Sequence, residues 1–250
     1  LYDFSLLKDF EEYNRKKILI SKGLDTDWMS KPLRSGYSIN NSIGASGRGN
    51  DMTYRVNANM RNIKGVMKDD YRNTIGLSMF LSYHVDNRVT VSFQSSYSDL
   101  TWKESPYGSF SDYVIMNPYD APYDEYGRVN KTMSWEMANP LFEAECGNYD
   151  EGASRSFTNT LSFRWDVLPG FFINGTGTIV TSRERTEKFI SPESNEFKDV
   201  ANRSEQGSLS INNIRRLSYE GKFVVNYAKN LGEDYLLTLH GGFDISKKTQ

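Results

Sequence analysis

Long runs of side chains that alternate between apolar and polar are the feature of this 250-residue sequence that most constrains its fold. Successive side chains of a β-strand point to opposite faces of the sheet, so alternation with a period of two predicts strands with one apolar face. The clearest run is Tyr71–Val85. Its apolar face carries Ile75, Leu77, Met79, Leu81, Tyr83 and Val85, while the other face is polar or small apart from Phe80. We therefore expect an all-β protein.

The same pattern recurs from about residue 37 onward and predicts about eight strands. The runs cover residues 37–47, 54–61, 71–85, 89–98, 157–167, 171–181, 217–227 and 235–245. Strands in soluble sheets usually hold about five or six residues, whereas a tilted strand needs about 9–11 residues to cross a lipid bilayer. Many of these runs have the greater length, which favours an antiparallel transmembrane β-barrel.

The connections between the runs alternate between short and long. Tight turns are predicted near residues 48–51, 86–88, 168–170 and 230–233, and longer links near 63–70, 99–156 and 184–207. This alternation is typical of outer-membrane barrels, which have tight periplasmic turns and long outer loops. It predicts antiparallel barrel strands over residues 37–250, with long outer loops at 99–156 and 184–207.

Composition excludes several other classes of protein. Aromatic residues make up 14% of the chain, which argues against disorder, and the net charge of -2 leaves no basic surface for nucleic acid. The longest apolar run is Tyr113–Met116, far short of the ~18 residues of a membrane-spanning helix. The single Cys146 excludes a disulfide framework and a cysteine-rich metal site.

Alternation leaves two other architectures open. Alternating strands also build soluble sandwiches, so a soluble β-sheet carbohydrate-binding module is one alternative. A small non-transporting outer-membrane barrel, complete in eight strands and acting as an adhesin or anchor, is the other. Arg, Asn, Gln and Lys at mid-strand positions and aromatic residues near strand ends favour a membrane barrel with a wet lumen.

Three stretches of sequence carry a resemblance to a known family. They are Thr26-Asp27-Trp28 with Arg34 and residues 37–47; residues 54–59 with 65–68 and 71–72; and residues 105–113 with 117–119 and 123–127. In this order they resemble SusC/RagA-type TonB-linked (TonB-dependent) outer-membrane transporters of the Bacteroidota, over roughly residues 26–130. The sequence departs from the family pattern at Asn40-Asn41, where a histidine is common.

The resemblance implies an internal piece of a 22-stranded barrel that encloses a plug. Residues 1–36 would then be an extracellular loop segment, in which the rhythm of Phe10, Tyr13, Ile18 and Ile20 predicts a short helix. Such transporters sit in the outer membrane of Gram-negative bacteria and import glycan or peptide oligomers. Their expected partners are a SusD-like lipoprotein, the TonB complex acting through an upstream segment, an oligosaccharide or peptide substrate, and the lipid bilayer.

Residues for catalysis are not evident. His84 and His240 are far apart in sequence and have no metal-ligand spacing, so we expect no metal, no cofactor and no enzymatic activity. The outer loop predicted at 99–156 contains several acidic residues that lack calcium-loop spacing, and we interpret them as a solvated surface. They are Asp120, Asp124, Glu125, Glu143 and Glu145.

The outer loop predicted at 99–156 is the candidate functional region because it is rich in aromatic residues. Flat rings can stack on a sugar or anchor a partner protein, and they lose little rotamer entropy in doing so. The candidate contact residues are Trp102, Tyr107, Phe110, Tyr113, Tyr119, Tyr123, Tyr126 and Trp135. The alternative is that these rings pack on each other and fold the loop over the barrel mouth. The predicted lumen-lining residues are Arg55, Arg61, Arg72 and Arg164, which could bind a passing oligomer or pair with plug carboxylates.

Overall fold

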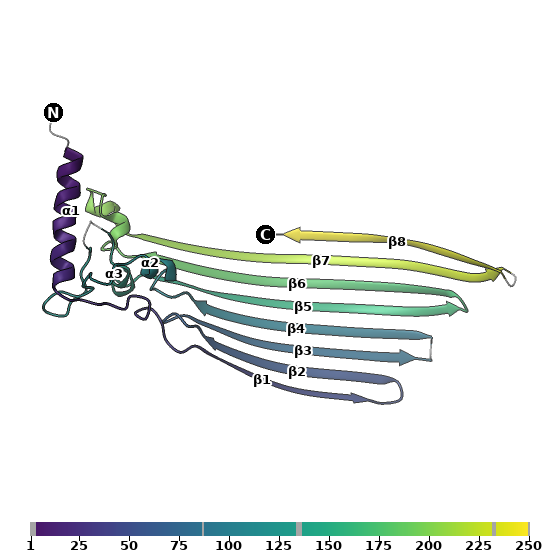
Figure 1. Ribbon diagram of the computed structural model, residues 1–250. Coiled ribbons are helices and arrows are strands. Elements are labelled where there is room, and N and C mark those ends of the chain that lie inside the picture. The colour runs from purple at the N-terminus through teal and green to yellow at the C-terminus, as the bar shows by residue number, and fades with distance from the viewer. Residues whose placement is uncertain (1–3, 87, 134–136, 232–233, 250) are drawn as a thin grey trace.

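A computed structural model describes residues 4–86, 88–133, 137–231 and 234–249 and shows one long antiparallel sheet (Figure 1). Its eight strands follow one another in sequence order from β1 to β8. They are β1 (Tyr37–Arg48), β2 (Met52–Lys64), β3 (Tyr71–Val85), β4 (Val89–Lys103), β5 (Tyr149–Leu168), β6 (Phe171–Ile190), β7 (Ser208–Leu231) and β8 (Tyr235–Thr249). The expectation of an all-β, antiparallel fold is confirmed.

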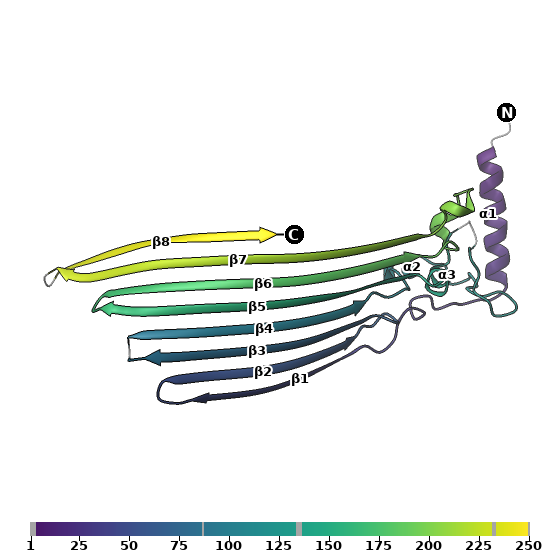
Figure 2. The same ribbon diagram turned by 180° about the vertical axis from the view of Figure 1, so that it is seen from behind.

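The two ends of the sheet differ in kind. The tight turns lie at one end, and the long connections and all the helices lie at the other (Figures 1 and 2). The helices are α1 (Phe4–Ser21), α2 (Phe110–Val114), α3 (Pro140–Glu145) and the 3₁₀ turns η2 (Asn195–Phe197) and η3 (Arg203–Glu205). Within the described residues, no helix is both long and apolar enough to span a membrane.

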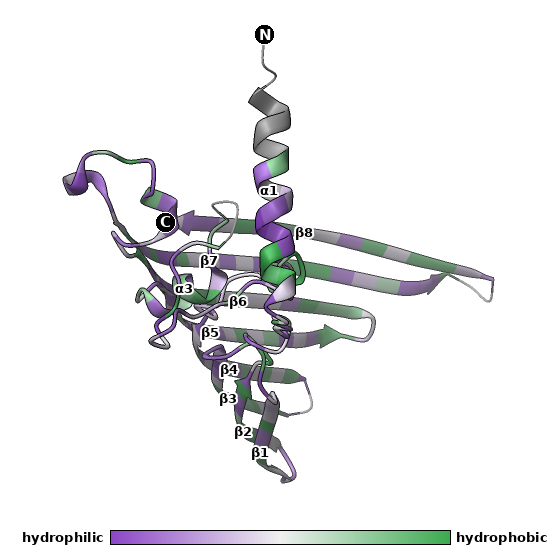
Figure 3. Cartoon of the chain, turned by 60° about the vertical axis from the view of Figure 1, so that its left-hand side comes forward, coloured by the Kyte–Doolittle hydropathy of each residue, from purple (hydrophilic) through white to green (hydrophobic). Residues whose placement is uncertain are grey.

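Hydrophobic and hydrophilic residues alternate along the strands (Figure 3). Because successive side chains of a strand point to opposite faces, the sheet has one apolar and one polar face. Ala58, Leu77, Tyr97 and Phe157 are successive cross-strand partners and therefore lie on the same face. Leu77 is 49% exposed in the isolated sheet. We call this the outward face, because its apolar side chains have no protein core to cover them.

Polar groups on the opposite face satisfy one another. The Ser92 hydroxyl donates to the Ser82 hydroxyl over 2.9 Å, and Ser82 is only 6% exposed. The hydroxyls of Thr160 and Thr178 lie 3.1 Å apart on neighbouring strands. We call this the inner face, and its small polar side chains suit a water-filled interior.

Charged residues end the apolar band on the outward face. Asp99, Arg155, Arg183 and Arg215 are successive cross-strand partners on β4 to β7. Between this row and the turn end, the outward face of β4 extends from Val89 to Tyr97, roughly the nine residues that a tilted strand needs to cross a bilayer.

Strands β5, β6 and β7 run beyond the lengths that alternation predicts. They hold 20, 20 and 24 residues, so the connecting segments are 104–148 and 191–207 rather than 99–156 and 184–207. In the extension of β5, charged residues such as Asp150, Glu151 and Arg155 occur on both faces. Alternation is lost there because both faces of the extension meet water, and it cannot mark where such strands begin.

The sheet is open. Strands β1 and β8 form its two edges and do not pair with each other in the described ranges (Figure 1). A barrel complete in eight strands would require that pairing, so the arrangement is that of a barrel segment. The N-terminal segment contains α1, an 18-residue helix that is longer than the short helix expected within residues 1–36.

Candidate functional site

The loop end of the sheet has a small hydrophobic core of its own. Trp28, Tyr113, Met133 and Leu141 are buried together, with Tyr107 and Met116 packed against them. Burial raises the pKa of the Tyr113 hydroxyl above its usual value. Segment 104–148, which we call the long loop, is thus a compact folded unit.

Two short helices build this unit and are capped by local sequence. Ser109 and Asp112 form a capping box at the start of α2. Asn139 caps α3, where its side chain accepts from the Leu141 backbone N–H, and Pro140 follows at the first helical position. These caps satisfy the free N–H groups of helices too short to be stable alone.

Asn139 also joins distant parts of the long loop. Its side chain is fully buried, and its amide donates to the backbone carbonyls of Pro122 (3.0 Å) and Asn130 (2.7 Å). Since a buried amide must be hydrogen-bonded, this residue fixes how segment 122–130 lies against α3.

The N-terminal segment is bound to the long loop. The Trp28 indole N–H donates to the Asn117 carbonyl over 2.8 Å, and the Thr26 hydroxyl donates to the Asp120 carbonyl over 3.0 Å. Asp120 is 2% exposed, so its interpretation as part of a solvated surface is wrong. Hydrogen bonds therefore hold residues 26–28 against residues 117–120, and the sequence resemblance includes residues 26–28 and 117–119.

Glu143 ties the long loop to segment 191–207. Its carboxylate accepts from the Ser194 hydroxyl (2.7 Å), the Asn195 backbone N–H (2.8 Å) and the Asn148 side-chain amide (3.2 Å). The interpretation of Glu143 as solvated is also wrong. Its role depends on η2, which lies about fifty residues further along, so its sequence neighbours gave no signal for it.

A cavity of about 450 Å³ lies where the long loop meets the strands. The charged residues of its lining are mostly acidic; they are Asp70, Glu104, Glu143, Asp150 and Glu196, with Lys188 as a positive group. Cys146 lies nearby at the end of α3, where burial raises the pKa of its thiol.

The aromatic candidates separate into packed and exposed rings. Trp102 lies in β4, with its indole ring against Gly152, and Tyr113 is buried in the loop core. Phe110 is 40% exposed, Tyr123 41% and Tyr126 83%. Tyr107 and Tyr119 are half-buried, and Trp135 lies outside the described residues. The rings available for contact are therefore those of Phe110, Tyr123 and Tyr126.

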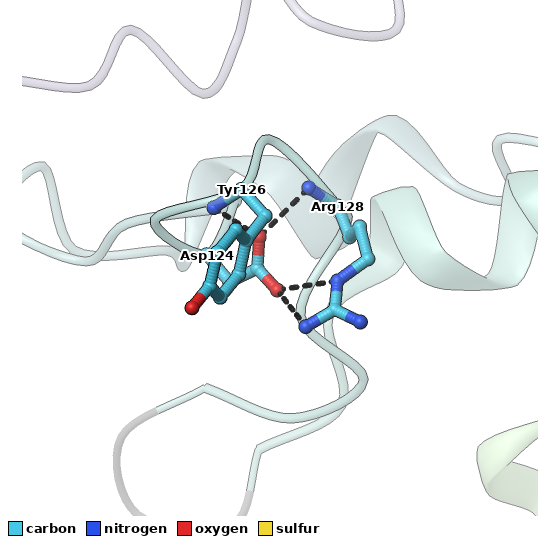
Figure 4. A network of polar contacts seen from close by, with 3 residues as sticks. All are labelled: Asp124, Tyr126 and Arg128. Carbon is cyan, nitrogen blue, oxygen red and sulfur yellow. Dashed lines mark hydrogen bonds and ion pairs between the residues drawn. The ribbon is translucent and has the colours of Figure 1, made fainter.

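Tyr126 is the most exposed ring, and a rigid turn presents it (Figure 4). One Asp124 oxygen accepts from the backbone N–H groups of Tyr126 (2.8 Å) and Arg128 (2.9 Å), and the other accepts from the Arg128 guanidinium (2.7 Å). The Arg128 guanidinium lies 5.3 Å from the centre of the Tyr126 ring. The backbone hydrogen bond from Arg128, followed by its side-chain contact, holds the pKa of Asp124 below its usual range.

The four predicted lumen arginines share the inner face. Arg72 pairs with Glu104 at 2.7 Å, and Arg164 pairs with Asp166 at 2.9 Å while its guanidinium covers the Phe172 ring at 4.1 Å. Arg55 lines a hollow of about 320 Å³ with Asn57, Ser78 and Gln94. Neither Arg55 nor Arg61 forms an ion pair within the described ranges, so both keep free hydrogen-bond donors on this face. No metal-binding group of three or more His, Cys, Asp or Glu occurs in the described part of the chain.

No protein-family model and no curated protein matches this sequence. Solved structures do match it. Structures of the RagAB peptide importer in its closed-closed and open-open states align with TM-scores of 0.67 and 0.69 at 14% identity. A further structure of the RagAB peptide transporter aligns with a TM-score of 0.69 at 15% identity. The ferric-catecholate import receptor Fiu from E. coli K12 aligns with a TM-score of 0.51 at 9% identity.

The alignments cover most of this chain but little of the solved chains. The RagAB matches cover 90% of this chain and 26% to 27% of theirs, and the Fiu match covers 87% of this chain and 35% of that receptor. The chain thus spans about a quarter of the length of the RagAB chains. Its fold is that of a segment of the barrels in these structures, which confirms the expectation of an antiparallel, partial barrel.

Proposed function

We propose that this chain forms part of a TonB-dependent importer in the outer membrane of a Gram-negative bacterium. The observation that carries the proposal is the open eight-stranded sheet, apolar outward and polar inward, which superposes on importer barrels over 90% of its length. The outward face provides a lipid-facing wall, and the inner face borders the passage. No bond is made or broken in this function; the protein moves its substrate.

The proposed substrate is a peptide or oligosaccharide. Matches to a peptide importer favour the peptide. On the inner face, Arg55 and Arg61 offer guanidinium donors that can bind the backbone carbonyls of a peptide as well as sugar hydroxyls. Asn57, Ser78 and Gln94 add neutral polar groups beside Arg55, which allow a polar oligomer to be held without trapping it.

The proposed partners are a SusD-like lipoprotein outside and the TonB complex inside, the latter acting through a segment upstream of this chain. Phe110, Tyr123 and Tyr126 project from a loop unit whose own core is complete without them. Exposed aromatic rings on a rigid support are typical anchors of protein interfaces. We assign them to contact with the lipoprotein, and the inner-face arginines to contact with the substrate.

Uptake by the intact transporter tests this function. Cells should accumulate a fluorescent oligopeptide or oligosaccharide, and deletion of the TonB complex should abolish accumulation while leaving binding at the cell surface largely intact. Uptake that persists unchanged without the TonB complex would exclude an energy-coupled importer. Surface binding of both oligomers without any uptake would instead favour an adhesin or anchor.

A pull-down tests the assignment of the exposed rings. Replacement of Tyr126 by Ser should weaken capture of the lipoprotein, whereas Tyr113→Phe, which leaves the buried core intact, should not. If Y126S captures the lipoprotein as well as the unmodified transporter does, the ring of Tyr126 is not an anchor.

A further inference from the structure

A row of arginines crosses three strands on the outward face. Arg155, Arg183 and Arg215 are direct cross-strand partners on β5, β6 and β7, and all three are exposed. Neighbouring strands are about 4.8 Å apart, so the row spans roughly 10 Å. We call these three residues the arginine row.

Two of the three charges have no counter-charge among the described residues, and the described part of β8 ends opposite Leu217, before it reaches Arg215. Arg155 pairs with Asp99 at 3.0 Å, but Arg183 and Arg215 form neither an ion pair nor a hydrogen bond through their side chains within the described residues. The next row toward the loops consists of Ala153, Arg185 and Asn213. Arg185 is itself bound to Glu187 at 2.9 Å, so no free carboxylate in the described part of the chain adjoins Arg183 or Arg215.

This arrangement is unfavourable for the isolated protein. Like charges directly opposite each other on neighbouring strands destabilise a sheet. An anion that binds both guanidinium groups removes the repulsion and gains charge-assisted hydrogen bonds. Phosphate is the best match, because the planar fork of arginine binds two phosphate oxygens at once.

The position of the row identifies the source of the phosphate. The next row toward the turns is Phe157, Thr181 and Leu217, which belongs to the apolar band. A molecule that meets both rows has an anionic group beside an apolar tail, as a membrane lipid does. Free phosphate would gain nothing from Phe157 or Leu217.

We propose that Arg183 and Arg215, assisted by Arg155, bind the phosphorylated headgroup of an outer-leaflet lipid, whose acyl chains pack on the apolar band below. The site lies on the outside of the barrel wall and is separate from the substrate passage. The choice of leaflet rests on the proposed function, since it requires the loop end to face outward.

Native mass spectrometry of the full-length transporter in neutral detergent tests the site. The probes are diphosphorylated lipid A, its dephosphorylated form and inorganic phosphate. The double variant Arg183→Gln/Arg215→Gln should bind diphosphorylated lipid A at least about tenfold more weakly than the unmodified protein. The control is Arg216→Gln, which removes a charge one residue away on the inner face, where Arg216 lies 3.6 Å from Glu184. This control should bind as the unmodified protein does.

Several results would overturn the proposal. They are equal binding by the double variant, an equal loss in R216Q, equal binding of the dephosphorylated lipid, or displacement of the lipid by an equal concentration of inorganic phosphate. A folding defect is tested separately. Because R215Q relieves repulsion, it should unfold in neutral detergent at the same temperature as the unmodified protein or higher, and a lower temperature would contradict the argument. The binding assay needs neither substrate nor TonB complex, so its failure is distinct from a failure of the proposed transport.

Discussion

Single side chains decide whether the loop end is ordered. Trp28 is 3% exposed and bonds to a carbonyl 89 residues away, and Asn139 is fully buried with hydrogen bonds to three backbone groups. Neither has a substitute in the described loop core. The order of this unit therefore depends on a few residues, whereas the exposed rings that it presents can change without loss of folding.

Replacement of Trp28 by Ala should loosen the long loop and leave the sheet intact. Loss of a buried tryptophan costs about 3–5 kcal/mol, which is enough to open a unit with so small a core. Hydrogen exchange should accelerate across residues 105–145 but not in β3 or β6. Trp28→Phe keeps most of the ring and loses the indole N–H, so its effect should be smaller, about 1–2 kcal/mol. Unchanged exchange in W28A would show that the loop is held by other contacts.

The turn that carries Tyr126 should open in acid. The pKa of Asp124 is lowered in the folded turn, so its ionised form is the one that stabilises the turn. That stability is present above the unfolded pKa of about 3.9 and is lost as the pH falls through the lower folded pKa. Resonances of Tyr126 and Arg128 in NMR spectra should shift together below about pH 4. Asp124→Asn should abolish this pH dependence, and an identical titration in D124N would assign the transition to another group.

At the scale of elements, the strands and the loops are joined by different means. Strands are joined by continuous backbone ladders, whereas the long loop and segment 191–207 are joined by a few side chains. Glu143 accepts from Ser194 and Asn195, Asn148 accepts from the Ser191 backbone N–H, and the Asn195 side-chain amide donates to the Lys131 carbonyl. Loss of the Glu143 carboxylate should therefore weaken this interface without disturbing the strand ladders.

Glu143→Ala should loosen segment 191–207 against the long loop, to which Asn148 and Asn195 still bind it. The carboxylate's hydrogen bonds to Ser194 and Asn195 would be lost, at a cost of about 1–3 kcal/mol. Hydrogen exchange at residues 191–200 should accelerate, while exchange in β5 and β6 stays unchanged. Glu145→Ala, two residues along the same helix, is the matched control and should have no effect. Equal acceleration in both variants would contradict the role of Glu143.

The sequence predicts strands well where one face is apolar and the other polar, and poorly where both faces carry charged residues. Strand β3 has the predicted bounds, Tyr71–Val85, because its outward face is apolar without a break from Ile75 to Val85. The start of β5 at Tyr149 was not predicted, since Asp150 and Glu151 place charges on both faces. The contact between Trp28 and Asn117 could not be derived at all, because no pattern of period two or 3.6 relates residues so distant.

At the scale of the whole molecule, the two faces of the sheet differ in chemistry. Outward side chains form rows that continue across strands, such as Ala58, Leu77 and Tyr97. A substitution in one strand therefore also affects the packing of its neighbours in the row. Inner residues are mostly polar, and those around Arg55 border a hollow. A substitution by a charged residue should therefore destabilise the protein at an outward position and be tolerated at the neighbouring inner position.

Met79→Arg should destabilise the transporter in membranes, whereas Ser78→Arg should be tolerated. Met79 lies on the outward face and is 41% exposed, and an arginine near the middle of the bilayer costs about 2–4 kcal/mol. Ser78 lines a hollow of about 320 Å³ on the inner face. Urea unfolding in lipid vesicles, followed by tryptophan fluorescence, should separate the two variants. The same loss of stability in both would mean that the faces are assigned wrongly.

The long loop has a core and helix caps of its own, and this separation affects how the protein can evolve. Mutations that alter Phe110, Tyr123 or Tyr126 touch neither the ladder between strands nor the buried residues around Trp28. Descendants of one ancestral gene could thus diversify in what they recognise while inheriting an unchanged wall. Natural variation should accumulate on these projecting rings far faster than at Asn139.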